Sequence, residues 1–211
     1  MSEYLPTINV VDDDPAVRRS LVRLLHSAGY HANSFASADE FFRFWEQHPS
    51  PGCVLLDIYM PGLDGLQLQQ KLRISVHAIP VIFMTGKGDV PSSVRAMKAG
   101  AVDFLPKPLD GEKLLKAVQE AVERDRRERK LRSELSEAKR RFEKLTPREY
   151  QVMSLVVRGL LNKQIAAELG LSEKTVKIHR GQVMRKLKVP SVPDLVRLAI
   201  RIGLKGESRP A

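Results

Sequence analysis

Residues 53–65 have the sequence CVLLDIYMPGLDG, in which an apolar run ends at Asp57 and a segment with Pro and Gly follows. Three other short apolar runs in the first half of the chain, INVV, VIFM and VDFLP, also end at a polar residue. Short runs rich in Val, Ile, Leu and Phe and bounded by Gly, Pro or polar residues are typical of buried parallel strands. The first half of the chain is therefore predicted to form a parallel sheet.

The polar residues that follow these runs are of the kinds that bind metal ions and phosphate groups. They are Asp12, Asp13, Asp57, Thr85 and Lys107. The carboxyl ends of parallel strands share one edge of a sheet, so these side chains should converge there. Clustered carboxylates attract Mg²⁺, and a hydroxyl and an ammonium bind phosphoryl oxygens. Any one of these residues could simply cap a helix or a turn, but five at one edge favour a binding site.

Length and composition allow one large domain or two ordinary ones, because the chain has 211 residues, of which 43% are hydrophobic. No apolar stretch approaches the ~20 residues of a membrane span, and no basic-then-apolar leader opens the chain. We therefore expect a soluble, cytoplasmic protein. Cys53 is expected to be a buried residue in a reducing compartment. The five His residues show no ligand spacing, so no zinc site is expected.

The net charge of +10 is unevenly distributed along the chain. Residues 1–125 contain 13 Lys and Arg against 16 Asp and Glu, whereas residues 126–211 contain 22 against 9. A near-neutral half followed by a strongly basic half indicates two domains with different partners, and the basic half suggests nucleic acid. The alternative is a basic surface that is merely solvated.

Strand-like and helical patterns alternate five times between residue 7 and about residue 122. This (βα)₅ alternation predicts an α/β domain with a doubly wound parallel sheet and right-handed crossovers. The second strand pattern, YHANSF, is the weakest and is expected near an edge of the sheet.

The motifs VVDDD, LLDIYMPGLDG, MTGKG and AGAVDFLPKP, together with their spacing, resemble the receiver domain of bacterial two-component response regulators. The resemblance covers roughly residues 5–125. It implies that Asp57 accepts a phosphoryl group from a sensor histidine kinase. It also implies that one Mg²⁺ is held by Asp13 and Asp57, by Asp12 through water, and by the backbone carbonyl of Tyr59.

The same resemblance assigns roles around the phosphoryl group. Thr85 and Lys107 would bind its oxygens, and Phe104 would be an aromatic switch that turns inward when Thr85 moves. Gly86 would keep the approach to the acceptor open, and the Lys107–Pro108 peptide bond would be cis. These roles make chemical sense, because carboxylate attack on a phosphoryl group accumulates negative charge that a metal ion and a Lys must neutralise.

Tyr59 and Lys87 are less usual, because each stands two residues after a site residue where side chains flank the phosphoryl group in the receiver family. One hypothesis is that their bulk hinders an attacking water and lengthens the life of the phosphorylated state. The alternative is that both side chains point to solvent.

Residues 112–144 contain neither Gly nor Pro and are dominated by strong helix formers. They predict one long helix from about residue 111 to 144. An apolar stripe with 4-3-4-3 spacing follows from Leu131, through Leu135, Ala138 and Phe142, to Leu145. Two heptads are too few to establish a coiled coil. The stripe could pair two chains or pack on the second domain, and we favour the second possibility.

The last third of the chain predicts compact helices. Residues 146–149, TPRE, fit a helix start with a Thr N-cap, Pro at the first position and Glu for a capping box. A second helix is expected over residues 162–169, ending at Gly170. A third follows Ser172 over residues 173–188. A helix, a short Gly turn and a second helix form a helix-turn-helix.

The third helix has two distinct faces at 100° per residue. The expected core face contains Val176, Val183 and Leu187. The opposite face contains Lys174, Lys177, Ile178, Gly181 and Arg185. Three cations, one apolar residue able to contact a thymine methyl and a Gly that allows close approach suit a DNA major groove. A solvated charged face is the alternative.

The segment LTPREYQVMSLVVRGLLNKQIAAELGLSEKTVKIHRGQVMRKL resembles the output domain of LuxR/FixJ/NarL regulators, over about residues 145–200. The resemblance implies a four-helix DNA-binding module in which Lys177 and Ile178 face bases and Gly181 lies alongside. Gly181 lacks the side chain that is common there. The last helix would help to form a DNA-bound dimer. The expected DNA-binding residues are Lys174, Thr175, Lys177, Ile178, His179, Arg180, Gly181 and Arg185.

The sequence therefore predicts a receiver domain over residues 1–122, a helical linker over residues 123–144, and an all-α four-helix helix-turn-helix domain over residues 145–211. The chain is interpreted as a response regulator that is phosphorylated on Asp57 and regulates transcription, as an activator. Expected partners are a sensor histidine kinase, double-stranded DNA at paired half-sites, a second copy of the chain and RNA polymerase. We expect no enzymatic activity beyond slow self-hydrolysis of the phosphorylated residue.

Two other functions are less compatible with the sequence. A Mg²⁺-dependent aspartyl phosphohydrolase is disfavoured because Tyr59 stands where an acid/base Asp would be needed, and because it leaves the basic helix-turn-helix unexplained. A DNA-binding regulator that does not depend on phosphorylation is disfavoured by the complete set of acidic pair, acceptor, Thr85 and Lys107.

Overall fold

The computed structural model describes residues 5–75, 77–86 and 90–203. The chain divides into two compact units, residues 1–129 and 130–211, and each has its own hydrophobic core. Within the described residues, no helix is both long and apolar enough to cross a membrane.

The first unit is built on a parallel sheet with the order β2-β1-β3-β4-β5 among the described residues. The strands are β1 (Thr7–Val11), β2 (His31–Phe35), β3 (Gly52–Asp57), β4 (Val81–Thr85) and β5 (Asp103–Pro106). The predicted doubly wound parallel sheet is confirmed, and β2 lies at an edge as its weak pattern indicated. The strand order reverses between β1 and β3, and in such sheets ligands bind beyond the carboxyl ends of the strands at this point.

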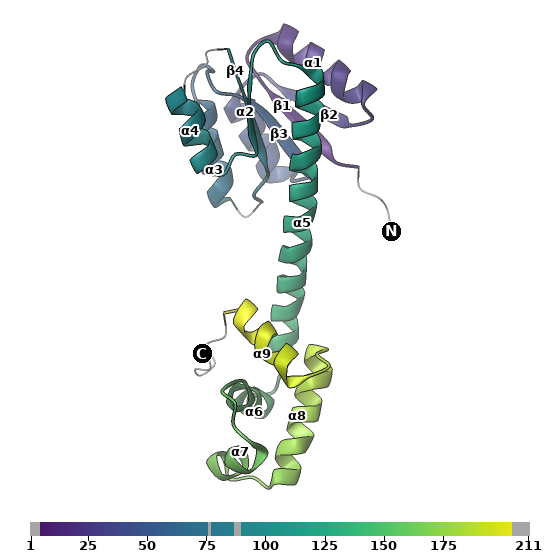
Figure 1. Cartoon of the computed structure of the whole chain (residues 1–211), viewed down its shortest axis with the longest axis vertical. Helices are drawn as coiled ribbons and strands as arrows, with labels where there is room; N and C mark the ends of the chain where they lie inside the picture. The colour runs from purple at the N-terminus through teal and green to yellow at the C-terminus, as the bar shows by residue number, and fades with distance from the viewer. Residues whose placement is uncertain (1–4, 76, 87–89, 204–211) are drawn as a thin grey trace. The chain divides into compact units, whose positions relative to one another are not determined.

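Helices cover both faces of the sheet (Figure 1). They are α1 (Pro15–Ser27), α2 (Ala38–Gln47), α3 (Gly65–Ile74), α4 (Val90–Lys98) and α5 (Gly111–Glu143). Leu25 of α1 and Val118 of α5 pack in one core cluster, and Trp45 of α2, Leu68 of α3 and Ala96 of α4 pack in the other. Both faces of the central strands are covered, which explains why β3 and β4 are continuous buried runs rather than alternating ones.

Over its described residues, 130–203, the second unit contains the last turns of α5 and four further helices. These are α6 (Pro147–Val157), α7 (Asn162–Leu169), α8 (Glu173–Leu187) and α9 (Val192–Arg201). The predicted capping box at the start of α6 is present, since Thr146 N donates to Glu149 Oε2 at 2.8 Å and Glu149 N donates to Thr146 Oγ1 at 3.2 Å. The helix α8 ends at Leu187, one residue earlier than predicted, because Lys188 adopts a left-handed conformation with φ of 55°.

The C-terminal part of α5 packs within the second unit. Ala138 and Phe142 are buried, and Phe142 and the following Leu145 belong to the core cluster that α6, α7 and α8 share. Leu131, at the start of the apolar stripe, is 48% exposed. These positions agree with the favoured possibility, in which the stripe packs on the second domain.

Candidate functional site

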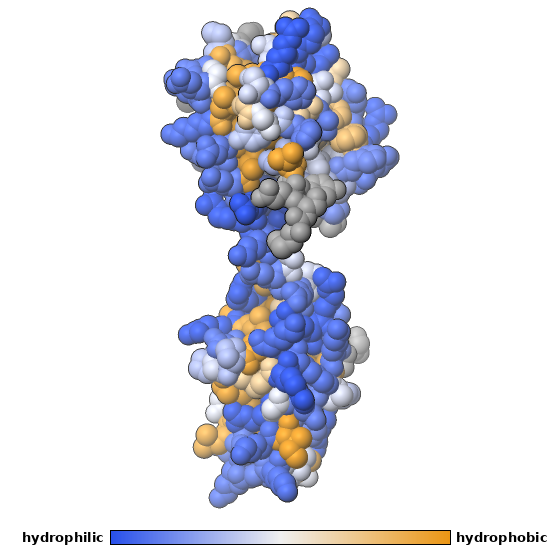
Figure 2. All heavy atoms as spheres, turned by 90° about the vertical axis from the view of Figure 1, so that its right-hand side faces the viewer, coloured by the Kyte–Doolittle hydropathy of each residue, from blue (hydrophilic) through white to orange (hydrophobic). Residues whose placement is uncertain are grey.

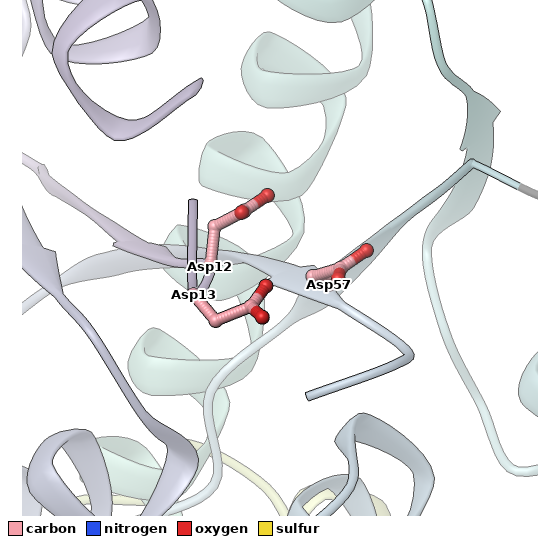
Figure 3. A group of neighbouring side chains, drawn as sticks. All are labelled: Asp12, Asp13 and Asp57. Carbon is pink, nitrogen blue, oxygen red and sulfur yellow. The ribbon is translucent and has the colours of Figure 1, made fainter. Parts of the chain in front are cut away.

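Three carboxylates meet at the carboxyl edge of the sheet. Asp57 is the last residue of β3, and Asp12 and Asp13 directly follow the neighbouring strand β1. One carboxylate oxygen from each residue lies within 4.8 Å of the other two (Figure 3). Asp12 is fully buried, Asp57 is 5% exposed and Asp13 is exposed to solvent. The parallel strands thus bring together residues that are distant in sequence, and leave one side of the group open.

Lys107, which follows β5, contributes a cation to the same group. Its Nζ lies 2.6 Å from Asp12 Oδ2 and 3.2 Å from Asp57 Oδ1. Its backbone N donates to the carbonyl oxygen of Thr85 at 2.6 Å, which ties the end of β5 to the end of β4. The Lys107–Pro108 bond is cis, as the resemblance implied.

Among the described residues the charges of this group are unbalanced, because Lys107 pairs with both Asp12 and Asp57 and a third carboxylate, that of Asp13, lies beside them. Burial raises the pKa of Asp57 above its ordinary value; the charges of Asp12 and Asp13 add to the rise, and Lys107 opposes it. Burial acts to lower the pKa of Lys107, but the hydrogen bond to Asp12 and the charges of Asp57 and Asp12 outweigh burial and raise it. The lysine therefore stays charged, while the cluster keeps an excess of negative charge.

The donor set fits Mg²⁺. This ion prefers oxygen ligands at about 2.0–2.1 Å in an octahedron, so ligands on opposite sides lie about 4 Å apart. The oxygens of Asp12, Asp13 and Asp57, within 4.8 Å of one another, are close to that spacing. The excess negative charge of the cluster also favours a divalent cation, because opposite charges attract.

Of the other predicted site residues of the first unit, Thr85 and Gly86 lie at the same edge of the sheet, whereas Phe104 pairs with Phe83 in the middle of β4. Thr85 is buried at the end of β4, and a Cβ added to Gly86 would meet no atom within 4 Å. Phe104 of β5 is half-buried against the core. Tyr59 is 49% exposed. Lys87 lies outside the described residues.

Two residues that support the site were not singled out from the sequence. Arg18 of α1 donates from Nη1 to the carbonyl oxygens of Asp12 and Asp13. A Cβ on Gly65 would lie 2.3 Å from the carbonyl oxygen of Asp57, so a Gly allows α3 to begin this close to the end of β3. Gly65 is part of the PGLDG motif, whereas Arg18 resembles any cation on an amphipathic helix.

In the second unit, helix α8 has one face buried in the core and an opposite face that is exposed and mostly polar. Val176, Val183 and Leu187 are buried, which confirms the predicted core stripe. Lys174, Lys177, Gly181 and Arg185 are exposed, and Ile178 is 52% exposed. A Cβ at Gly181 would meet no atom within 4 Å, so packing within the domain does not require Gly there. The part of this unit seen in Figure 2 is mostly hydrophilic, with small hydrophobic patches.

Three further residues predicted to bind DNA, Thr175, His179 and Arg180, are partly buried within the domain. Ser172 Oγ accepts from Thr175 N at 3.1 Å and caps α8. Arg180 Nη1 donates to Asn162 Oδ1, which links α8 to the first turn of α7. The Nδ1 atom of His179 is buried, so this edge of the ring faces the interior of the domain. The contacts of Thr175 and Arg180 help to hold the helix-turn-helix together.

Comparison with known families identifies both units. Residues 8–119 match the response regulator receiver domain, and residues 143–199 match the luxR family of bacterial regulatory proteins. The chain belongs to the response regulators that carry a DNA-binding output domain. Within that class it is a transcriptional regulator of the FixJ/NarL type.

Individual relatives match over almost the whole chain. Nodulation protein W of Bradyrhizobium diazoefficiens is 49% identical over 92% of this chain and 86% of its own length. The transcriptional regulatory protein FixJ of Azorhizobium caulinodans is 42% identical over 97% of this chain and 96% of its own length. A low-resolution structure of the response regulator StyR has a TM-score of 0.79 at 44% identity, and the match covers 93% of this chain and 99% of the StyR chain.

Proposed function

We propose that a sensor histidine kinase phosphorylates Asp57 and that this modification controls binding of the second domain to DNA. The observation that carries the proposal is the imbalance of charge around Asp57. A buried carboxylate with a raised pKa lies beside two other carboxylates and, within the part of the chain that the structure describes, is paired with the ammonium of Lys107, which is 3.2 Å away. Such a group gains stability when a divalent cation joins it, and the cation together with Lys107 can then offset the charge that a phosphoryl group adds.

The reaction is a transfer of a phosphoryl group from a phosphohistidine of the kinase. A carboxylate oxygen of Asp57 forms a bond to phosphorus as the bond from phosphorus to the histidine nitrogen breaks, and the histidine leaves with the electron pair. Lys107 would pair with a phosphoryl oxygen and Thr85 would donate a hydrogen bond to another. Mg²⁺ held by Asp13, Asp57 and the Tyr59 carbonyl, with Asp12 through water, would neutralise the remaining charge.

Loss of the phosphoryl group by slow self-hydrolysis would be the chain's only turnover. Tyr59 is half-exposed beside the acceptor strand, a position that allows its ring to hinder an attacking water. A Tyr59→Asn variant is expected to lose phosphate faster than the parent, and an unchanged rate would count against this role.

The switch would pass through Thr85 and Phe104 to neighbouring helices. The half-buried state of Phe104 leaves its ring able to turn further inward when Thr85 moves toward a phosphoryl group. The equilibrium between two receiver conformations would then change the surface that the receiver presents. Phosphorylation would favour a homodimer, and a dimer binds paired half-sites and recruits RNA polymerase as an activator.

In the DNA complex, α8 would lie in the major groove. Its exposed polar face supports this, because Lys177 and Ile178 are free to reach base edges and the bare backbone at Gly181 allows close approach. Lys174 and Arg185 would contact phosphates. Thr175, His179 and Arg180 would contribute mainly by orienting the helix, since Thr175 and Arg180 have contacts within the domain and one ring nitrogen of His179 is buried.

A binding assay with and without the small phosphodonor acetyl phosphate tests the proposal. DNA from upstream of the adjacent genes is titrated with the parent protein, with Asp57→Asn and with the surface control Asp39→Asn. Acetyl phosphate should tighten binding of the parent and the control by about tenfold, within the usual range of allosteric coupling, and leave Asp57→Asn unchanged. Equal affinity in every case would overturn the phosphorylation switch, and intact-protein mass would show whether phosphate was incorporated.

A second measurement distinguishes dimerisation from release of an occluded helix. If phosphorylation acts by dimerisation, analytical ultracentrifugation should detect a dimer only after phosphorylation, and residues 130–211 alone should bind DNA weakly. If the receiver occludes α8 instead, that fragment should bind without phosphate and the full chain should remain monomeric. The fragment has its own hydrophobic core, so it can be expected to fold.

A further inference from the structure

Arg18 makes a contact with the acidic pair that no other described side chain makes. It lies on α1 and points back toward the end of β1. Its Nη1 donates to the carbonyl oxygen of Asp12 at 2.6 Å and to that of Asp13 at 2.9 Å. One guanidinium nitrogen therefore holds the backbone of both acidic residues.

The backbone of this turn sets where the two carboxylates point. Asp12 N donates to Phe35 O at 3.2 Å, and Asp14 N donates to Asp12 Oδ1 at 2.9 Å. These bonds fix Asp12 from the strand side and from within the turn. The carbonyl of Asp13, whose side chain is exposed, is held by Arg18. The position of the more exposed acid, Asp13, thus depends on a residue that is not itself acidic.

We propose that Arg18 is a positioning residue for the divalent cation: it orients the Asp12–Asp13 turn so that both carboxylates face Asp57. The inference rests on the proposed function, in which these acids hold Mg²⁺. Groups that orient metal ligands without touching the metal commonly change metal affinity by about 10–100-fold when they are removed.

The charge of Arg18 and its hydrogen bonds act on Mg²⁺ binding in opposite directions. A cation behind the acidic pair repels a second cation, so removing only its charge tightens Mg²⁺ binding. Removing its two hydrogen bonds frees the turn and weakens Mg²⁺ binding. The sign of the change therefore identifies which effect dominates, and positioning requires a weaker site.

The test compares Mg²⁺ affinity in the unphosphorylated full chain by calorimetric titration. Arg18→Ala should weaken binding by about 10–100-fold, and Arg18→Lys, which can still donate to one carbonyl, should weaken it less. The matched control is Arg19→Ala, which removes an exposed cation from the neighbouring position of the same helix. It should leave the affinity unchanged or slightly increase it.

A rate measurement separates positioning from damage to the fold or to the chemical step. With acetyl phosphate, Arg18→Ala should need a proportionately higher Mg²⁺ concentration for half-maximal phosphorylation but reach the maximal rate of the parent. Circular dichroism melts in the absence of Mg²⁺ check the fold, and the Lys variant provides the test if the Ala variant does not fold.

The outcomes are separable. Unchanged or tighter Mg²⁺ binding by both Arg18 variants, or a lowered maximal rate with unchanged Mg²⁺ dependence, would overturn the positioning role while leaving Asp57 as the phosphoacceptor. If the parent protein itself neither binds Mg²⁺ nor incorporates phosphate, the proposed function and this inference fail together.

Discussion

Each domain buries acidic groups around one lysine, but the two arrangements differ in balance. In the receiver, Lys107 lies 2.6 Å from Asp12 and 3.2 Å from Asp57. In the DNA-binding domain, Lys186 of α8 lies 2.6 Å from Glu149 of α6, which is 2% exposed. Lys107 pairs with two carboxylates, those of Asp12 and Asp57, whereas Lys186 pairs with the single carboxylate of Glu149.

The pKa values of the two acids move in opposite directions for this reason. Burial and neighbouring acids raise the pKa of Asp57 despite Lys107. Burial also acts to raise the pKa of Glu149, but the hydrogen bonds from Lys186 and from Thr146 N outweigh it and lower the pKa. A balanced buried pair stabilises a fold, whereas an unbalanced one retains the capacity to bind a cation. The opposite pKa shifts therefore distinguish the structural ion pair of Glu149 from the candidate functional cluster around Asp57.

The largest expected effect comes from breaking the balanced pair with Lys186→Met. This change leaves the Glu149 carboxylate buried without its cation, and should destabilise the DNA-binding domain by about 3 kcal/mol. Differential scanning calorimetry of the full chain would follow the unfolding transition of that domain. The matched control is Lys174→Met, on an exposed position of the same helix. If both variants unfold at the same temperature, the pair has no structural role.

The next effect is that of Glu149→Gln, which keeps the shape of the side chain but removes its charge. At pH 7 it should cost about 2 kcal/mol, the value of a charged hydrogen bond. A lowered folded-state pKa means that the stabilisation is present above the pKa of about 4.3 of an unfolded Glu and is lost as pH falls through the folded value. Urea titrations should therefore show a constant cost from pH 7 to about 5 and a decline only below about pH 4. A cost that declines already near neutral pH would contradict the lowered pKa.

Asp57→Asn should have the opposite sign in Mg²⁺-free buffer. It removes a buried charge that repels Asp12 and Asp13, so the receiver should gain roughly 1 kcal/mol at pH 7. Because the folded-state pKa of Asp57 is raised, its penalty is present above that pKa and is lost as pH falls through it. Urea unfolding in EDTA should thus show a gain that shrinks toward acid pH. Destabilisation at pH 7 would mean that Lys107 already balances the cluster.

The sequence predicted the residues of the acidic cluster better than the residues that hold the cluster in place. Asp12, Asp57 and Lys107 each follow an apolar run, and the parallel topology alone requires the ends of such runs to share an edge. The doubly wound parallel sheet followed from the alternation of strand and helix patterns, and the edge position of β2 from its weak apolar pattern. Strand periodicity is a local property, so it can be recognised without knowing which residues touch.

Contacts between elements could not be predicted in the same way. Arg18 contacts a strand end, and Arg180 contacts Asn162 across a helix pair. In the sequence both arginines are simply cations on amphipathic helices. Whether such a cation faces solvent, DNA or a backbone carbonyl depends on distances that arise only after the helices pack.

The smallest effect on stability is expected where charge is neither buried nor balanced, on the exposed face of α8. Lys177→Ala should change stability by no more than about 0.5 kcal/mol, because its side chain is exposed.

In the DNA complex, however, each lysine that neutralises a phosphate contributes about 1 to the slope of log affinity against log salt, whereas a lysine that reads a base changes sequence preference instead. Titrations of the phosphorylated protein at several salt concentrations, on operator and on unrelated DNA, would separate these roles. The charge-matched control is Lys116→Ala on the receiver part of α5. If Lys177→Ala weakens binding mainly to the operator, this lysine reads bases, as its position on α8 suggests; a loss equal to that of the control would exclude it from the DNA interface.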